Sequence, residues 1–422
     1  MTRPRVPATL VLLAMLLPAT AGAQGLARRI AASGTATLQF SFAARTGVCG
    51  DGRHYFSTAP GNFNGTIDQH RAEPCVAGPV RVVVTRADGA TIALNTYVGP
   101  LAVEPGATDL GTVGTTEAVE YLLALAAEVD GRPGRDAILP AAIADSVTVG
   151  PRLLALGRDR NRTRETRRSA LSWAGRLSRD DAGAARIATQ IGDVARDAAD
   201  DRSVRGHSVS VLARIERGGG VPELLTLVRG DDPWLADQAM TALSRSGDPR
   251  ARPVLREIAG RGDAPEALRV SAIAGLGRAY ATPDDAAFLR QQFGRLQGSK
   301  ERDAVIAALT GLGGAANVRW LLDVARNGEV PIALRRKAVT GASRAGATSA
   351  ELVPLYDVLE DRQMRETLVD LYVRSGDRAS IERLLTIARD ETDRNLRRRT
   401  ISRLSRLDDP RVREALREMV ER

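Results

Sequence analysis

The chain has 422 residues, of which 43% are hydrophobic, 26% are charged and only 4% are aromatic. Its formal charge is +9, but 51 acidic residues are interspersed among 60 basic ones, which indicates a mixed, solvated surface rather than a dedicated nucleic-acid-binding stripe. No apolar run reaches 18 residues, which argues against a transmembrane helix.

The first 23 residues are predicted to be a secretory signal peptide. Arg3 and Arg5 form a basic start, residues 8–17 are an apolar run, and residues 21–23 form a small-residue cleavage site. The mature chain would begin at Gln24, with 58 basic and 51 acidic residues and a charge of +7. We therefore expect an exported protein, periplasmic or secreted and soluble after cleavage, and no natural nucleic-acid partner.

Residues 24–110 are predicted to form a small β-rich segment. Apolar and polar residues alternate over residues 37–42, and two β-branched runs, 79–85 and 91–98, flank an Asp-Gly hairpin signal at residues 88–89. Residues 46–78 are rich in glycine, proline and asparagine and are interpreted as a loop. A segment this small is near the limit for a core of its own, so we expect it to pack against the first helices.

Both cysteines and two of the three histidines lie in that loop, in the mirror-image pattern Cys49-x4-His54 and His70-x4-Cys75. In an oxidising compartment, a single disulfide between the cysteines is the simplest interpretation. A zinc site formed by the four side chains is an alternative, because cysteine and histidine are zinc ligands. A third interpretation is a reactive thiol beside a histidine, in an enzymatic or metal-dependent module that includes Asp51.

Residues 111–422 are predicted to be a helical repeat array. Arg269 is followed by Ala272, Ile273 and Leu276, which places three apolar side chains on one face of a helix. The same phrase recurs at intervals of 30 to 38 residues, which is the signature of stacked repeats. Its copies begin at Arg135, Arg167, Arg205, Arg269, Arg302, Arg335, Arg365 and Arg397, and a ninth copy at Ala236 lacks only the arginine.

The paired helices and loop phrases such as Gly247-Asp248-Pro249 resemble bacterial HEAT repeats of the phycobilisome-lyase-like type, over residues 115–422. The resemblance implies a mainly α fold: a right-handed α-solenoid of about nine HEAT-like helix pairs after the β-rich segment. Arrays of this kind usually serve as binding surfaces or spacers, and a minority belong to enzymes. The 38-residue step before Arg205 departs from the pattern and suggests a bend or a longer loop at residues 197–202.

The repeated arginines favour a structural role, because a residue that recurs in every repeat meets the same neighbours each time. We expect them to bond backbone carbonyls or acidic loop side chains such as Asp201, Asp232 and Asp263. Two dense basic clusters, residues 158–168 and 394–406, are either solvated helix surface or a surface for an anionic partner. The arginines that could form such a surface are Arg164, Arg168, Arg399, Arg403 and Arg406.

No phosphate-binding loop, hydrolase elbow or His-Glu-x-x-His motif is present, and we expect no cofactor. The leading hypothesis is an exported, non-enzymatic protein–protein interaction or scaffold protein that uses the solenoid surface. One alternative is an enzyme or metal-dependent module centred on Cys49, His54, His70 and Cys75. Another is an electrostatic binder of an anionic glycan or lipid surface.

Overall fold

The computed structural model describes residues 21–53, 55–57, 76–100, 103–178, 181–278 and 281–421. Contacts divide the chain into two compact units, unit 1 (residues 1–219) and unit 2 (residues 220–422). The β-rich segment belongs to unit 1 together with the first helices. The division between compact units therefore falls within the repeat array.

Unit 1 contains a four-stranded sheet in the order β5-β4-β1-β6. The strands are β1 (Ala36–Phe42), β4 (Val80–Ala87), β5 (Ala90–Val98) and β6 (Thr108–Thr112). β4 pairs antiparallel with β1 and β5, whereas β6 pairs parallel with β1. The predicted hairpin is confirmed: Asp88 and Gly89 join β4 to β5 with φ of 50° and 78°, the left-handed conformations that a tight hairpin turn requires.

The loop prediction over residues 46–78 is wrong for two short stretches. β2 (Val48–Gly50) and β3 (Tyr55–Ser57) form an antiparallel two-stranded sheet there. Each has only three residues, too few for a period-two pattern to be recognised in the sequence.

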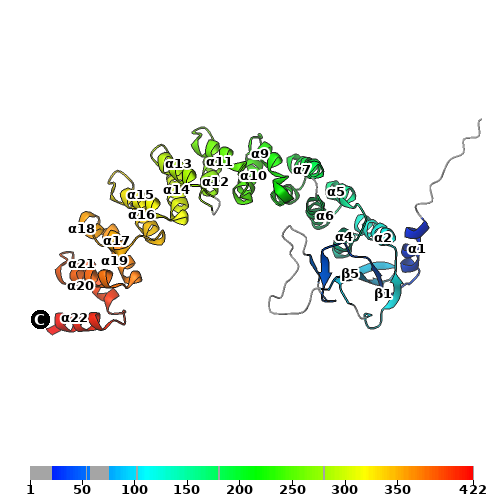
Figure 1. Cartoon of the computed structure of the whole chain (residues 1–422), viewed down its shortest axis with the longest axis horizontal. Helices are drawn as coiled ribbons and strands as arrows, with labels where there is room; N and C mark the ends of the chain where they lie inside the picture. The colour runs from blue at the N-terminus through cyan, green and yellow to red at the C-terminus, as the bar shows by residue number, and fades with distance from the viewer. Residues whose placement is uncertain are drawn as a thin grey trace, which may run out of the picture. The chain divides into compact units, whose positions relative to one another are not determined.

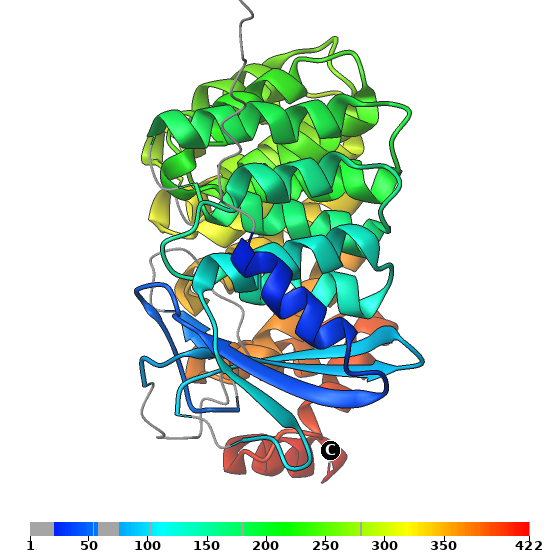
Figure 2. The ribbon, with the colours of Figure 1, turned by 90° about the vertical axis from the view of Figure 1, so that its right-hand side faces the viewer.

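The four-stranded sheet completes its core with α2 (Thr115–Glu128). Phe40 and Phe42 are fully buried, and the ring of Phe40 meets Tyr121 of α2 edge to face at 6.0 Å. The amphipathic α1 (Ala21–Ala31), which the sequence analysis missed, lies alongside α2 and buries Leu26 and Ile30 (Figure 2). The packing of the small sheet on the first helices is confirmed.

The other helices of unit 1 begin the array. They are α3 (Arg132–Asp136), α4 (Ile138–Ala142), α5 (Gly150–Arg158), α6 (Arg164–Arg176), α7 (Asp181–Arg196), α8 (Arg202–Leu212) and the 3-10 helix η1 (Glu216–Gly218). α4, α6 and α8 pack successively, with α5 and α7 against them. The long step before Arg205 reflects the length of α7, which has 16 residues, and not only its loop.

Unit 2 continues the same pairing in two layers (Figure 1). The arginine-led layer contains α10 (Pro233–Ser246), α12 (Glu266–Leu276), α14 (Ser299–Leu312), α16 (Ile332–Arg344), α19 (Arg362–Ser375) and α21 (Arg394–Leu404), each packed on the next. The second layer contains α9 (Val221–Val228), α11 (Ala251–Gly260), α13 (Pro283–Phe293), α15 (Ala315–Arg326), α17 (Ser349–Leu352), α18 (Leu355–Val358), α20 (Arg378–Asp390) and α22 (Pro410–Glu421).

The apolar positions of the repeat phrase form the core between the layers. In α12, Ala272, Ile273 and Leu276 are at most 2% exposed, as the spacing predicts. The loop phrases act as caps: Asp232 accepts hydrogen bonds from the first amides of α10, and Gly247 ends that helix with φ of 68°. Of the helices that the structure describes, none is both long and apolar enough to span a membrane.

Candidate functional site

The repeated arginines bond the chain that precedes their own helices. Arg167, Arg205 and Arg335 each donate from Nε to a carbonyl ten residues earlier, at 2.9 Å, and Arg302 and Arg365 donate to a carbonyl six residues earlier, at 2.8 Å. The side chains of Arg269 and Arg397 also reach preceding carbonyls, whereas Arg135 bonds the adjacent Asp136. These guanidinium groups therefore hold connections inside the array in place.

Some of the arginines that bond a carbonyl also pair with a carboxylate. Arg167 forms a bidentate pair with Asp200, in which both side chains are 4% exposed. Arg269 pairs with the buried Glu301, and Arg365 lies 3.8 Å from Glu391. These carboxylates differ from the ones that we expected.

The three expected aspartates serve other groups. Asp201 and Asp232 accept from the first amides of α8 and α10, because each is the N-cap of its helix. Asp263 pairs with Arg261 in the same loop. In sequence, a capping aspartate and one that pairs with an arginine look alike, since both precede a helix by a few residues.

A row of polar pairs joins successive arginine-led helices on their exposed side, and we call it the surface row. Within unit 1, Ser172 of α6 meets His207 of α8 at 2.8 Å. Within unit 2, the row contains Asp237–Ser271 at 3.2 Å, Asp303–Lys337 at 2.6 Å, Arg336–Thr367 at 3.2 Å and Asp370–Arg399 at 2.7 Å.

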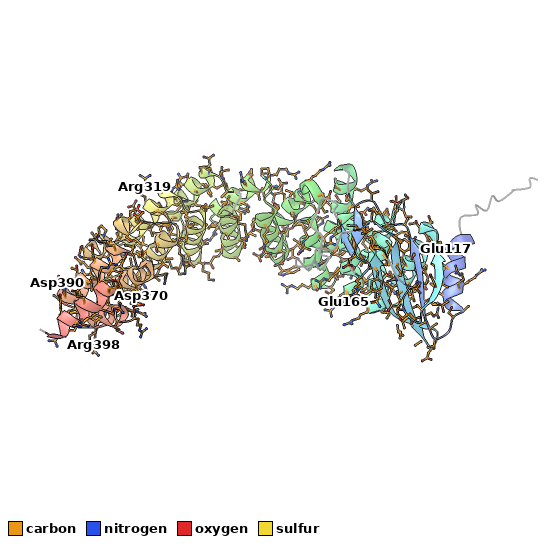
Figure 3. All side chains as sticks on the ribbon, turned by 60° about the horizontal axis from the view of Figure 1, so that its bottom comes forward. Glu117, Glu165, Arg319, Asp370, Asp390 and Arg398 are labelled. Carbon is orange, nitrogen blue, oxygen red and sulfur yellow. The ribbon has the colours of Figure 1, made fainter. Side chains whose placement is uncertain are left out.

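Three of the five arginines predicted to meet an anionic partner already lie close to an aspartate. Arg399 and Arg403 both bond Asp370 of α19, which is labelled in Figure 3. Arg164 lies 3.8 Å from Asp201. Arg168 and Arg406 are exposed, and neither forms an ion pair within the described part of the chain. The basic cluster at residues 158–168 belongs to unit 1, and the cluster at residues 394–406 belongs to unit 2.

His207, the third histidine of the chain, is half-buried between α6 and α8. Its Nε2 lies 2.8 Å from Ser172 Oγ and 3.0 Å from the carbonyl oxygen of Arg168. A carbonyl can only accept, so Nε2–H donates to Arg168 and cannot also accept the hydroxyl proton of Ser172. This geometry does not provide the nucleophile and base of an acyl-transfer site.

Burial, followed by the nearby charge of Arg168, lowers the pKa of His207 to about 4 despite the hydrogen bond to a carbonyl. The unfolded chain, with the ordinary value near 6.5, then binds more protons than the folded chain between these two pH values. Stability should fall as pH drops from about 6.5 to about 4, and this loss should be absent from His207→Gln, which can still donate to the carbonyl. In urea unfolding, we expect the variant to be more stable than wild type by about 2 kcal/mol at pH 4 but not at pH 7. An identical pH dependence in both proteins would contradict this role.

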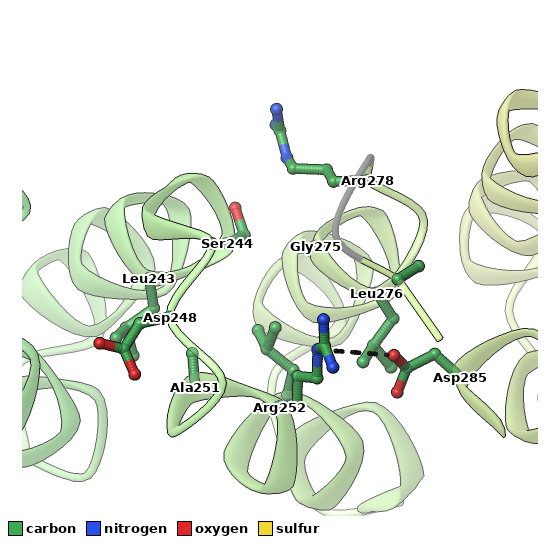
Figure 4. Close-up of a pocket in the computed structure, with 12 residues that line it drawn as sticks. Leu243, Ser244, Asp248, Ala251, Arg252, Gly275, Leu276, Arg278 and Asp285 are labelled. Carbon is green, nitrogen blue, oxygen red and sulfur yellow. Dashed lines mark ion pairs between the residues drawn. The ribbon is translucent and has the colours of Figure 1, made fainter. Parts of the chain in front are cut away.

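Unit 2 contains a cavity of about 20 Å³ between α10–α11 and α12–α13, which has room for about one water molecule. Asp285 at its edge is completely buried, and Arg256 donates to it at 2.8 Å from Nε. Figure 4 shows the second ion pair of Asp285, with Arg252, at 3.7 Å. The carboxylate also accepts from Thr282 and caps α13, so the polar groups here already satisfy one another. The site supports the junction between repeats.

The cysteine and histidine pattern is described only at Cys49, in β2, and at Asp51. His54, His70 and Cys75 lie outside the described residues, so the disulfide and the alternative zinc site both stay predictions. Within the described ranges, no group of three histidine, cysteine, aspartate or glutamate residues could hold a metal ion.

A family model described as HEAT repeats matches residues 191–277. The fold is a HEAT-like α-solenoid. This confirms the fold class predicted from the repeated phrase, with about nine helix pairs and a small N-terminal sheet. The sequence matches no curated protein.

Several solved structures are similar to this chain. Human deoxyhypusine hydroxylase in complex with glycerol has 17% identity and a TM-score of 0.26, over 61% of this chain and 94% of that one. The CpcE–CpcF complex of phycocyanin lyase from Nostoc sp. PCC7120 has 15% identity and a TM-score of 0.29, over 60% and 94%. Lipovitellin has 11% identity and a TM-score of 0.46, over 80% and 41%. At these values, what those proteins bind or catalyse remains a property of those proteins alone.

Proposed function

We propose that this protein is an exported, non-enzymatic scaffold that binds a partner protein on the exposed side of its arginine-led helices. The observation that carries the proposal is the inward bonding of the repeat arginines. Because most of them hold a backbone connection in place, the helices behind the exposed side are fixed before a partner arrives. A surface ordered in advance loses little conformational entropy on binding, which favours affinity.

The exposed side of α12 and α14 has the character of a contact surface. Ala274 and Ala307 are exposed there, between the polar pairs of the surface row. Small side chains let a partner approach the helices closely, while the flanking polar pairs can fix its register. The surface row contains both acidic and basic side chains, which favours a protein as the binding partner over a uniformly anionic glycan or lipid surface.

Affinity purification of the tagged chain from the native cell envelope tests the proposal. We expect a stoichiometric partner with wild type and with Ala287→Glu, which adds a charge at an exposed position of α13 in the second layer. The double variant Ala274→Glu, Ala307→Glu should lose that partner, because it places charge on the proposed contact surface. Repeated recovery of the wild-type protein alone would contradict a scaffold role.

The same purified sample tests export and the proposed disulfide between Cys49 and Cys75. Its intact mass should correspond to a chain that begins at Gln24, and both cysteines should react with an alkylating agent only after reduction. A full-length chain would contradict cleavage, and thiols that react without reduction would contradict the disulfide.

A further inference from the structure

Each polar pair of the surface row is one step between two helices. The step between α6 and α8, like the Arg336–Thr367 step, lacks the carboxylate that the other three steps contain. Within unit 2, Asp237, Asp303 and Asp370 each supply a carboxylate to the next arginine-led helix. Asp370 pairs with Arg399, which follows a repeat arginine by two residues, just as His207 follows Arg205. In unit 1, the residue that faces His207 is Ser172, so the pair at that step contains no acidic side chain.

Basic side chains surround this step. Arg168 of α6 and Arg214, just after α8, are exposed and form no ion pair within the described residues. Both lie close enough to His207 to oppose its protonation. On α6, Glu165 lies one turn before Arg168 and is exposed (Figure 3), but it does not pair with that arginine. Among the residues that the structure describes, no carboxylate therefore forms an ion pair with Arg168 or Arg214.

A small cavity lies beside the pair. It measures about 10 Å³ and is lined by Ser172, Gly175, Arg176, Val211 and Arg214. That volume suits a single oxygen atom. The guanidinium of Arg176 lies 5.1 Å from the centre of the Trp173 ring, which gives this third cation a fixed position. Ser172 and Arg176 of α6 and Arg214, just after α8, therefore line a space of the size of one oxygen atom.

We propose that the step between α6 and α8 binds a carboxylate from an acidic segment of a partner protein. Arg168 and Arg214 would pair with the negative charge, and the hydroxyl of Ser172 would donate to the carboxylate oxygen that enters the cavity. The inference rests on the proposed scaffold function, to which it adds a site and the chemistry of the partner. The bound carboxylate would take the place that aspartates occupy at other steps of the surface row.

His207 provides a direct measurement of occupancy. A carboxylate beside Arg168 and Arg214 would offset the positive field, so the pKa of His207 should rise when the site fills. We would titrate the full chain with a hexaglutamate peptide and follow the imidazole signal of His207 by NMR. The signal is assigned by its absence from the His207→Gln variant. We expect a saturable rise of that pKa, and an affinity at least tenfold weaker in the double variant Arg168→Gln, Arg214→Gln.

The matched control is Arg394→Gln, Arg398→Gln, which removes two charges from exposed positions of α21. This variant should bind the peptide as wild type does. Equal losses in both double variants would show attraction to net charge alone and overturn the site. A His207 signal that responds to inorganic phosphate but not to hexaglutamate would also overturn it, in favour of a small-anion site.

The envelope purification separates this inference from the scaffold function. A partner recovered equally by wild type and by the Arg168→Gln, Arg214→Gln variant would support the scaffold and overturn this carboxylate site. A partner that only wild type recovers would support both.

Discussion

Replacing Asp200 by asparagine is expected to lower the free energy of unfolding of unit 1 by about 3–5 kcal/mol. The substitution leaves Arg167 buried without a counter-charge, because both side chains of the bidentate pair are 4% exposed. Burial opposes ionisation of Asp200, but the hydrogen bonds from Arg167 and from the Asp201 amide keep the pKa of Asp200 below its usual value of 3.8. The pair therefore contributes fully above that value, and its contribution is lost as pH falls through the lower folded-state pKa.

Urea unfolding at pH 7, with hydrogen exchange of the α6 and α7 amides, measures this effect. Asp193→Asn is the matched control, because it also removes one negative charge from an ion pair, but an exposed one with Arg196. We expect the control to change stability by less than about 1 kcal/mol. If the two variants unfold alike, the buried pair does not stabilise this part of the array.

Replacing Gly277 by alanine should destabilise unit 2 by about 2–3 kcal/mol. A Cβ at Gly277 would lie 2.4 Å from the Cβ and 2.7 Å from the Cα of Ala308 on α14. The obstacle includes backbone, so a side-chain rotation cannot relieve it and α12 and α14 would have to separate. Gly277 has a φ of −90°, which alanine adopts without strain, so the predicted loss comes from packing alone.

Gly311→Ala provides the control for helix propensity and for added volume. It lies in α14, and the nearest atom to its added Cβ is the Gly277 carbonyl oxygen at 3.9 Å, an ordinary contact. We expect a neutral or slightly stabilising effect, since alanine favours helix over glycine by roughly 0.5–1 kcal/mol. Differential scanning calorimetry measures the Tm of both variants, and we expect only Gly277→Ala to lower it. An unchanged Tm for Gly277→Ala would contradict the close packing of Gly277 against Ala308.

The repeat array could be predicted because its information is local and repeated. Three apolar positions at helical spacing identify one buried face, and nine copies make chance agreement negligible. The hairpin at Asp88 and Gly89 could be predicted for the same reason, since it depends on neighbouring residues. The division of one second-layer helix into the short α17 and α18 was not predicted, although it falls beside Pro354.

The partners of individual polar side chains could not be predicted. Asp200 and Asp201 are adjacent in sequence, yet one pairs with Arg167 and the other caps α8. The contact between Ser172 and His207 joins residues 35 positions apart, and a serine and a histidine carry no signal of meeting at that distance. Such contacts depend on the rotation of one helix relative to the next, which apolar periodicity specifies only to within a face.

Because most repeat arginines bond a carbonyl within ten residues before them, this bonding does not depend on how many repeats precede or follow. A duplicated helix pair would bring its own arginine–carbonyl hydrogen bond, and a deleted pair would remove only its own. The corresponding hydrogen bonds in the other repeats would stay unchanged. Copy number can therefore vary over evolutionary time without new polar contacts having to arise. The length of the array becomes a heritable quantity that selection can adjust to the size of a partner, one helix pair at a time.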